Sequence, residues 1–119
     1  MSKKIDITGR TFEFALKILK LTNELSKDST SARLLSNQLL RAGTSIGANF
    51  EEAQAAESKA DFIHKYKIAL KEARETKYWL RLLIASDMEK KINLDSLAKE
   101  SDEICSIIAK ITINALKNK

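Results

Sequence analysis

The chain has no proline, and only three glycines and one cysteine occur among its 119 residues. Proline and glycine break helices, so their scarcity is typical of long helices with short connections and argues against a sheet protein or a disordered tail. The single cysteine, Cys105, excludes an internal disulfide and a cysteine-based metal cluster. Because this length leaves room for one core, we expect one all-α domain over residues 1–119.

Histidine is equally scarce, since His64 is the only one. No second imidazole is available to complete a metal site with it. The neighbouring Glu51 and Glu52 point about 100° apart on a helix, so they cannot act together on one substrate. We therefore expect a protein that is not an enzyme, with no catalytic residue, no metal ion and no cofactor.

The chain also lacks a long apolar run. Residues Met1 to Asp6 do not form the apolar core of a secretory signal, and the longest apolar stretch, near Leu80 to Ala85, is too short to span a bilayer. We therefore expect a cytoplasmic protein without a membrane partner.

Apolar residues recur at spacings of three and four in four segments, which predicts helices over residues 11–26, 31–57, 59–86 and 94–117. Ser58 and Asp61 form a variant of the capping box that marks the start of the third helix. Residues 87–93 form the last joint. The fourth segment has the seam of an antiparallel bundle, formed by Leu97, Ser101, Ile104, Ile108, Ile111 and Ala115. We expect an antiparallel up-down-up-down four-helix bundle.

The first predicted helix has an unusually wide apolar stripe, which must be largely covered by other parts of the protein. Two rows make up this stripe: Phe12, Leu16 and Leu19, and beside them Phe14, Ile18, Leu21 and Leu25.

Gly43 and Gly47 lie inside the second predicted helix, where each glycine costs about 0.5 to 1 kcal/mol relative to alanine. Close packing of another helix against these positions would offset that cost. A phosphate-binding loop is the alternative, but no strand precedes the glycines and no Gly-Lys-Ser or Gly-Lys-Thr ending follows them.

A polar ridge accompanies these glycines, because Arg41, Ser45, Asn49 and Glu52 follow one another by four, four and three residues. Such a ridge serves either as an ion-pair and hydrogen-bond network that ties helices or subunits together, or as a direct ligand contact. The sequence leaves both interpretations open.

Positive charge gathers on the third predicted helix. Seven basic and three acidic residues lie between Lys59 and Arg81, so this segment carries +4 of the chain's net charge of +5. One flank forms a cationic strip about 20 Å long, made of Lys67, Lys71, Arg74, Tyr78 and Arg81. Such a strip suits a phosphate backbone. The alternative is a solvated face laced with pairs such as Asp61–Lys65 and Lys71–Glu75.

A second apolar patch on this helix, formed by Ile68, Trp79 and Leu82, lies away from its main apolar face. A helix in an isolated four-helix bundle needs only one buried face. An additional patch with a tryptophan therefore indicates a contact with another chain, and we expect a homo-oligomer.

Two motifs resemble the 23S rRNA intervening-sequence protein family, also called four-helix-bundle proteins. They are Arg41-x-x-x-Ser45-Ile46-x-x-Asn49-x-x-Glu52 and Tyr78-Trp79-Leu80. The resemblance implies a barrel-shaped homopentamer of antiparallel four-helix bundles. It also implies a link to RNA, because members were first noted as reading frames inside intervening sequences of bacterial large-subunit ribosomal RNA genes. A related branch is similar to the accessory variability proteins of diversity-generating retroelements, where a basic pentamer engages a reverse transcriptase and nucleic acid.

We therefore interpret the chain as an oligomeric module that binds nucleic acid, RNA in the first place and DNA as the alternative, through the cationic strip. Two other interpretations stay open. One is an adaptor that docks a partner protein such as a reverse transcriptase, and the other is a purely structural oligomer.

Overall fold

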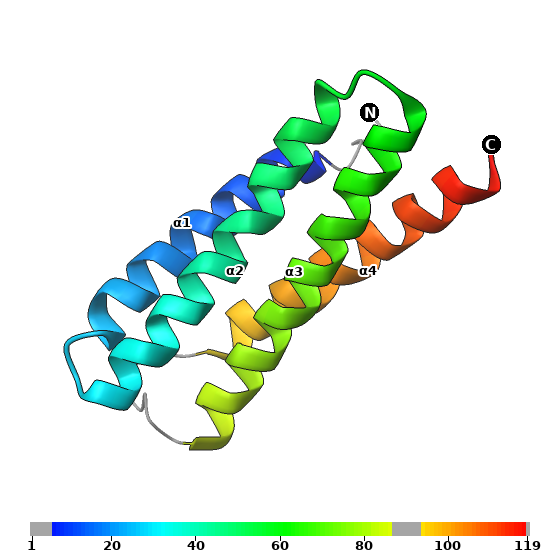
Figure 1. Ribbon diagram of the computed structural model, residues 1–119. Helices are drawn as coiled ribbons and strands as arrows, with labels where there is room; N and C mark the ends of the chain where they lie inside the picture. Colours follow the sequence, from blue (N-terminus) through cyan, green and yellow to red (C-terminus); the bar gives the residue numbers. More distant parts are fainter. Residues whose placement is uncertain (1–5, 87–93, 119) are drawn as a thin grey trace.

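The computed structural model describes residues 6–86 and 94–118, which form four helices and no strand (Figure 1). They are α1 (Ile7–Leu25), α2 (Thr30–Gln54), α3 (Lys59–Ser86) and α4 (Asp95–Lys117). The prediction of an all-α fold with four helices is confirmed over this part of the chain. The predicted joint at residues 87–93 lies outside the described residues.

Short polar side chains determine where three of the helices begin. The Asp6 carboxylate accepts a hydrogen bond from the Gly9 backbone N–H at 3.0 Å, so α1 begins at Ile7, four residues before the predicted start. The Ser29 hydroxyl caps α2 in the same way. The predicted cap of α3 is present, because the Asp61 N–H donates to the Ser58 hydroxyl at 3.0 Å.

The end of α2 differs from the prediction by three residues, since the helix ends at Gln54 and not at residue 57. The N–H groups of Ala55 and Ala56 donate to carbonyls three residues earlier. This tighter bonding closes the last turn and ends the α-helix.

The helices pack in chain order, with α2 lying along both α1 and α3, and α4 lying along α3 and a shorter part of α1. In Figure 1 the C-terminal end of α4, shown in red, diverges from the other helices. This divergence agrees with the burial of the predicted seam, because Ile104 and Ile108 are buried whereas Ile111 and Ala115 are only half-buried. All four helices contribute fully buried side chains to the core, including Phe14, Ile18, Leu39, Ile46, Phe50, Leu80, Leu83, Ile104 and Ile108.

The prediction that Gly43 and Gly47 allow close helix packing is confirmed. A β-carbon at Gly43 would lie 3.0 Å from two side-chain carbons of Ile18, and one at Gly47 would lie 3.3 Å from the Thr11 hydroxyl. Both neighbours belong to α1, so the glycines let α1 and α2 approach more closely than larger residues would allow.

An ion pair that the sequence did not indicate connects α1 to α4. The Arg10 guanidinium donates to both carboxylate oxygens of Glu100, at 2.7 and 3.1 Å, and to Glu103 at 3.0 Å. The hydrogen bond to Glu100, together with Glu103, raises the pKa of Arg10 above its usual value. Bidentate geometry of this kind fixes the orientation of two helices as well as their distance.

Candidate nucleic-acid interface

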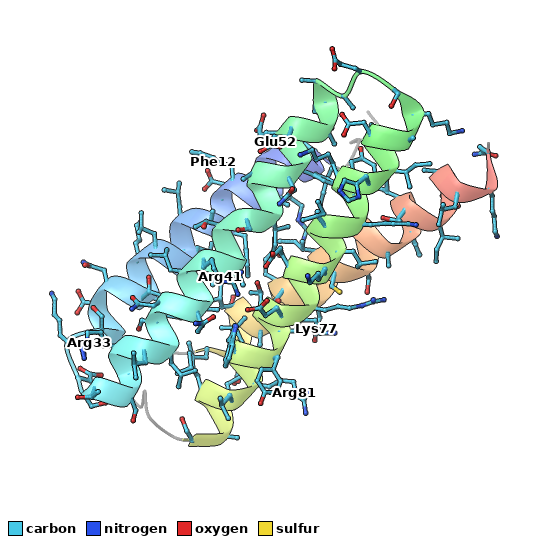
Figure 2. All side chains as sticks on the ribbon, in the orientation of Figure 1. Phe12, Arg33, Arg41, Glu52, Lys77 and Arg81 are labelled. Atoms are coloured by element: carbon cyan, nitrogen blue, oxygen red, sulfur yellow. The ribbon has the colours of Figure 1, made fainter. Side chains whose placement is uncertain are left out.

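The five residues of the cationic strip lie along the outer flank of α3, and all five are exposed: Lys67, Lys71, Arg74, Tyr78 and Arg81. The opposite side of the helix packs into the core through residues such as Tyr66, Ala73 and Leu80. Figure 2 shows Arg81 projecting from α3 on the side away from α2. The strip is therefore a continuous surface feature of one helix.

Glu72 and Glu75 of α3 do not neutralise this strip, because they pair with α2. Arg41 of α2 forms an ion pair with Glu72 at 3.3 Å and a closer one with Glu75. The pair that the sequence suggested between Lys71 and Glu75 is therefore not the one formed. Glu75 instead forms part of the ion-pair contact between α2 and α3.

Two other cations of α3 also have partners on neighbouring helices. Lys65 bonds to Glu52 of α2 at 2.7 Å, and this bond, with a smaller effect of Asp61, raises the pKa of Lys65. Lys77 pairs with Asp102 of α4 at 3.2 Å.

The strip cations contrast with these paired residues. Lys67, Lys71, Arg74 and Arg81 form no ion pair with any residue in the ranges 6–86 and 94–118. Their charges are therefore available to a ligand from solvent. The two helices that flank α3 pair with Glu72, Glu75 and two of its lysines, and the outer cations have no ion-pair partner within the described residues.

The aromatic member of the strip is held by its neighbour. Tyr78 is 53% exposed, and its ring lies edge to face with that of Trp79, with centroids 5.1 Å apart and planes at 71°. The Trp79 indole N–H in turn donates to Glu75 at 3.0 Å. Tyr78 is thus connected through Trp79 and Glu75 to Arg41 of α2.

The predicted oligomer patch is partly covered by the chain itself. Trp79 is half-buried and packs against the core of its own protomer, and Ile68 is also half-buried. Leu82 keeps 39% of its surface exposed. The helical period placed these residues away from the main apolar face, but it did not show that Trp79 packs against the core.

A larger exposed apolar surface lies on α1. From the sequence we expected other parts of the protein to cover this stripe. The exposed fractions of the first row of its stripe are 60% for Phe12, 38% for Leu16 and 49% for Leu19. Figure 2 shows Phe12 pointing outward from α1. We call these three residues the α1 row. The width of the stripe was the signal in the sequence, but only the packing shows that residues 6–86 and 94–118 leave this row exposed.

The polar ridge of α2 has the contacts of a network that ties two helices together. Ser45 donates to the Arg41 carbonyl at 2.6 Å, and Asn49 donates to the Ser45 carbonyl at 2.8 Å, so both bond to their own helix. The two ends of the ridge, Arg41 and Glu52, reach the side chains of α3. The contacts between α2 and α3 therefore come from the two ends of the ridge.

Over residues 6–86 and 94–118, no group of three histidine, cysteine or acidic side chains is arranged to hold a metal ion. Within the same ranges, no helix combines the length and the apolarity that crossing a membrane requires.

Comparison with known proteins agrees with the two motifs. The family model of the 23S rRNA-intervening sequence protein matches residues 3–110. Among solved structures, a protein of unknown function from the S23 ribosomal protein family of Bacteroides thetaiotaomicron is 42% identical, with a TM-score of 0.80, and the match covers 89% of this chain and 97% of that one. No curated protein matches the chain. The chain therefore belongs to the 23S rRNA-intervening sequence protein family.

Proposed function

We propose that this protein is a non-enzymatic homo-oligomer that binds nucleic acid, RNA in the first place, through the cationic strip of α3. The observation that carries the proposal is the pattern of ion pairs. Glu72 and Glu75 are engaged by Arg41, while four exposed cations on the outer flank have no acidic partner among the described residues. A row of uncompensated cations on a rigid helix is suited to phosphate groups.

One strip alone is a weak binding site. Four cations neutralise only a few phosphates, and each contact contributes an affinity that falls as salt rises. Several copies of the strip in one assembly would act together, because binding at one strip raises the effective concentration of the ligand at the next. We therefore propose that assembly and binding are connected, with the homopentamer as the expected form.

The α1 row supports assembly with further copies of the same chain. Three large apolar side chains exposed along one helix, beginning with Phe12, are unusual for a monomer. A closed ring needs two different surfaces on each subunit. We propose that the α1 row of one copy packs against the patch of Trp79 and Leu82 on the next.

The binding test is a titration of single-stranded RNA, structured RNA and duplex DNA at about 50 and 200 mM salt, a range over which multi-phosphate contacts lose orders of magnitude in affinity. Replacing Lys67, Lys71 and Arg74 together by glutamine should abolish binding while the oligomer stays intact. The matched control replaces Arg33, Lys99 and Lys110 by glutamine. These residues are exposed on α2 and α4, so the control removes three positive charges, as the first variant does, but from outside the strip.

The control separates a local site from general charge attraction. If both triple variants lose binding equally, the strip is not the site. If the wild-type protein binds none of the three nucleic acids at the lower salt, the proposal is wrong, and an adaptor that docks a partner protein such as a reverse transcriptase becomes the better interpretation.

The assembly test is light scattering at tens of micromolar protein. Phe12→Glu should shift the wild-type oligomer toward monomers and leave the helix content unchanged, because the side chain is exposed in the protomer. Glu13→Gln, at the next exposed position, is the control. Trp79→Ala should also weaken assembly, because removing an aromatic from an interface often costs about 2 kcal/mol or more. A monomeric wild-type protein contradicts this part of the proposal.

A further inference from the structure

The two tyrosines of the chain have opposite environments. Tyr66 is buried and packs against Phe50 and Phe62, with ring centroids 4.7 and 4.3 Å apart. Tyr78 is 53% exposed and lies in the cationic strip, between Arg74 and Arg81. Core packing therefore explains Tyr66 and does not explain Tyr78.

We propose that Tyr78 is a stacking platform for an unpaired base, so that the strip binds single-stranded RNA in preference to a duplex. The inference rests on the proposed function and adds the class of nucleic acid that the strip selects. Three observations support the inference: the Tyr78 ring lies between two cations, Trp79 packs against the ring, and one face of the ring stays uncovered.

The position places the ring between two cations. Arg74 lies four residues before Tyr78 and Arg81 three residues after it, which is about 6 and 4.5 Å along the helix axis. A backbone whose phosphates contact these two arginines passes directly over the ring. Its bases can then reach the ring from the same side.

The support keeps the ring from turning freely. Trp79 packs against it from one side, is itself half-buried, and is held by its hydrogen bond to Glu75. A ring that is already oriented loses less freedom when a ligand stacks on it.

The edge-to-face geometry leaves room for a base. At an interplanar angle of 71°, either the edge of Tyr78 meets the face of Trp79 or the reverse. In both arrangements at least one face of the Tyr78 ring stays uncovered by Trp79. The exposed fraction of the side chain is consistent with a free face.

The preference for a single strand follows from what a duplex can offer. In a duplex the bases already stack on one another, so they cannot lie on a protein ring without unstacking. In a single strand every base has an available π-face, and stacking on an aromatic side chain tolerates any sequence. The cations alone would bind both forms.

The experiment compares an unstructured, fluorescently labelled oligoribonucleotide with a duplex RNA of the same length, titrated against the wild-type protein and Tyr78→Ala. We expect the variant to bind the single strand about 5- to 150-fold more weakly, the range that alanine substitution of one stacking aromatic produces. Binding of the duplex should change by less than about twofold, because its phosphate contacts remain.

Two further variants identify the interaction. Tyr78→Phe should retain single-strand binding, because stacking does not need the hydroxyl group, whereas Tyr78→Leu should lose it although an apolar side chain remains. Trp79 is the only tryptophan and its ring centroid lies 5.1 Å from that of Tyr78, so its fluorescence should respond to the single strand and not to the duplex. Light scattering checks that every variant keeps the assembly of the wild-type protein.

The outcomes distinguish this inference from the proposed function. If Tyr78→Ala binds the single strand as tightly as the wild type does, or loses both forms equally, stacking is disproved. The variant with Lys67, Lys71 and Arg74 replaced should bind neither the single strand nor the duplex. This result would support the strip as the binding site even if stacking on Tyr78 is disproved. A wild-type protein that binds neither form overturns the inference and the proposed function together.

Discussion

Both flanks of α3 carry charged residues, but the flanks differ in the sign of those charges and in the partners that surround them. Toward α2, each charged side chain named above has a partner: Glu72 and Glu75 bond to Arg41, and Lys65 bonds to Glu52. On the outer flank, Lys71 and Arg74 form no ion pair within the described residues. Lys71 lies one helical turn from Glu75 and could pair with it, but Glu75 pairs with Arg41 instead.

The comparison teaches that the charge of a helix face depends on its neighbours as much as on its own sequence. Arg41 of α2 forms ion pairs with two carboxylates of α3. These carboxylates are then not available to the cations of the outer flank, which is more positive than it would be on an isolated α3. A contact that ties two helices together therefore also prepares the surface that we propose as the binding site.

The largest effect should come from disrupting the core that holds both flanks in place. Ile104→Asp or Ile108→Asp places a carboxylate at a fully buried position. With no partner, such a charge carries a desolvation cost of about 4 kcal/mol or more, a large part of the stability of a small domain. We expect loss of the folded state in a thermal melt followed by circular dichroism.

Lys99→Asp is the control for this substitution, because it introduces the same carboxylate at an exposed position of α4. It should leave the midpoint of thermal unfolding within a few degrees of the wild-type value. An unchanged midpoint for Ile104→Asp would mean that the seam of α4 does not face the core.

A smaller effect should follow from breaking the contact that distinguishes the two flanks. Arg41→Gln releases Glu72 and Glu75, so Glu75 becomes free to pair with Lys71 one turn away and to lower the positive potential of the strip. We expect RNA affinity to fall by about 2- to 10-fold at low salt, although no strip residue has changed. Stability should fall by only about 1 kcal/mol or less, because Arg41 is half exposed.

Lys65→Gln is the matched control for Arg41→Gln, since it removes one positive charge and one ion pair between α2 and α3 but frees a carboxylate of α2. Urea unfolding and RNA titration should show a similar loss of stability and a smaller loss of affinity. Equal losses of affinity in the two variants would argue that net charge, and not the direction of Glu75, determines binding.

The smallest effect should come from removing the carboxylate itself. Glu75→Gln makes the surroundings of the strip one charge more positive, so RNA should bind slightly more tightly, by about twofold at low salt. The glutamine oxygen can still accept the Trp79 N–H, so the support of Tyr78 should persist. Weaker binding would show that the Glu75 charge supports the site and does not oppose it.

Local features of the structure were predictable from the sequence. The Ser58 hydroxyl bonds to an N–H only three residues away, and the strip residues share one flank of α3 because the helical period places them there. The burial of Ile104 and Ile108 follows from the same period. In each case the cause lies within a few turns of one helix.

Contacts between helices were not predictable in the same way. The pairs Arg41–Glu75 and Arg10–Glu100 join residues 34 and 90 positions apart, and nothing in their local pattern selects one carboxylate over another. The helical period predicted the direction in which Trp79 points from α3, but it did not predict that the core would partly bury this side chain. It gave the width of the α1 stripe, but not that Phe12 would remain exposed.

The sequence by itself determined the four helices, the seam of α4 and the gathering of cations on one flank of α3, because short-range hydrogen bonds and helical periodicity control these features. Tertiary structure alone decided which charges are neutralised and which apolar rows are covered, because both depend on the helix that packs alongside. Within the described residues, Lys71 has no ion-pair partner because Glu75 pairs with Arg41, and the α1 row is exposed because no described helix covers it.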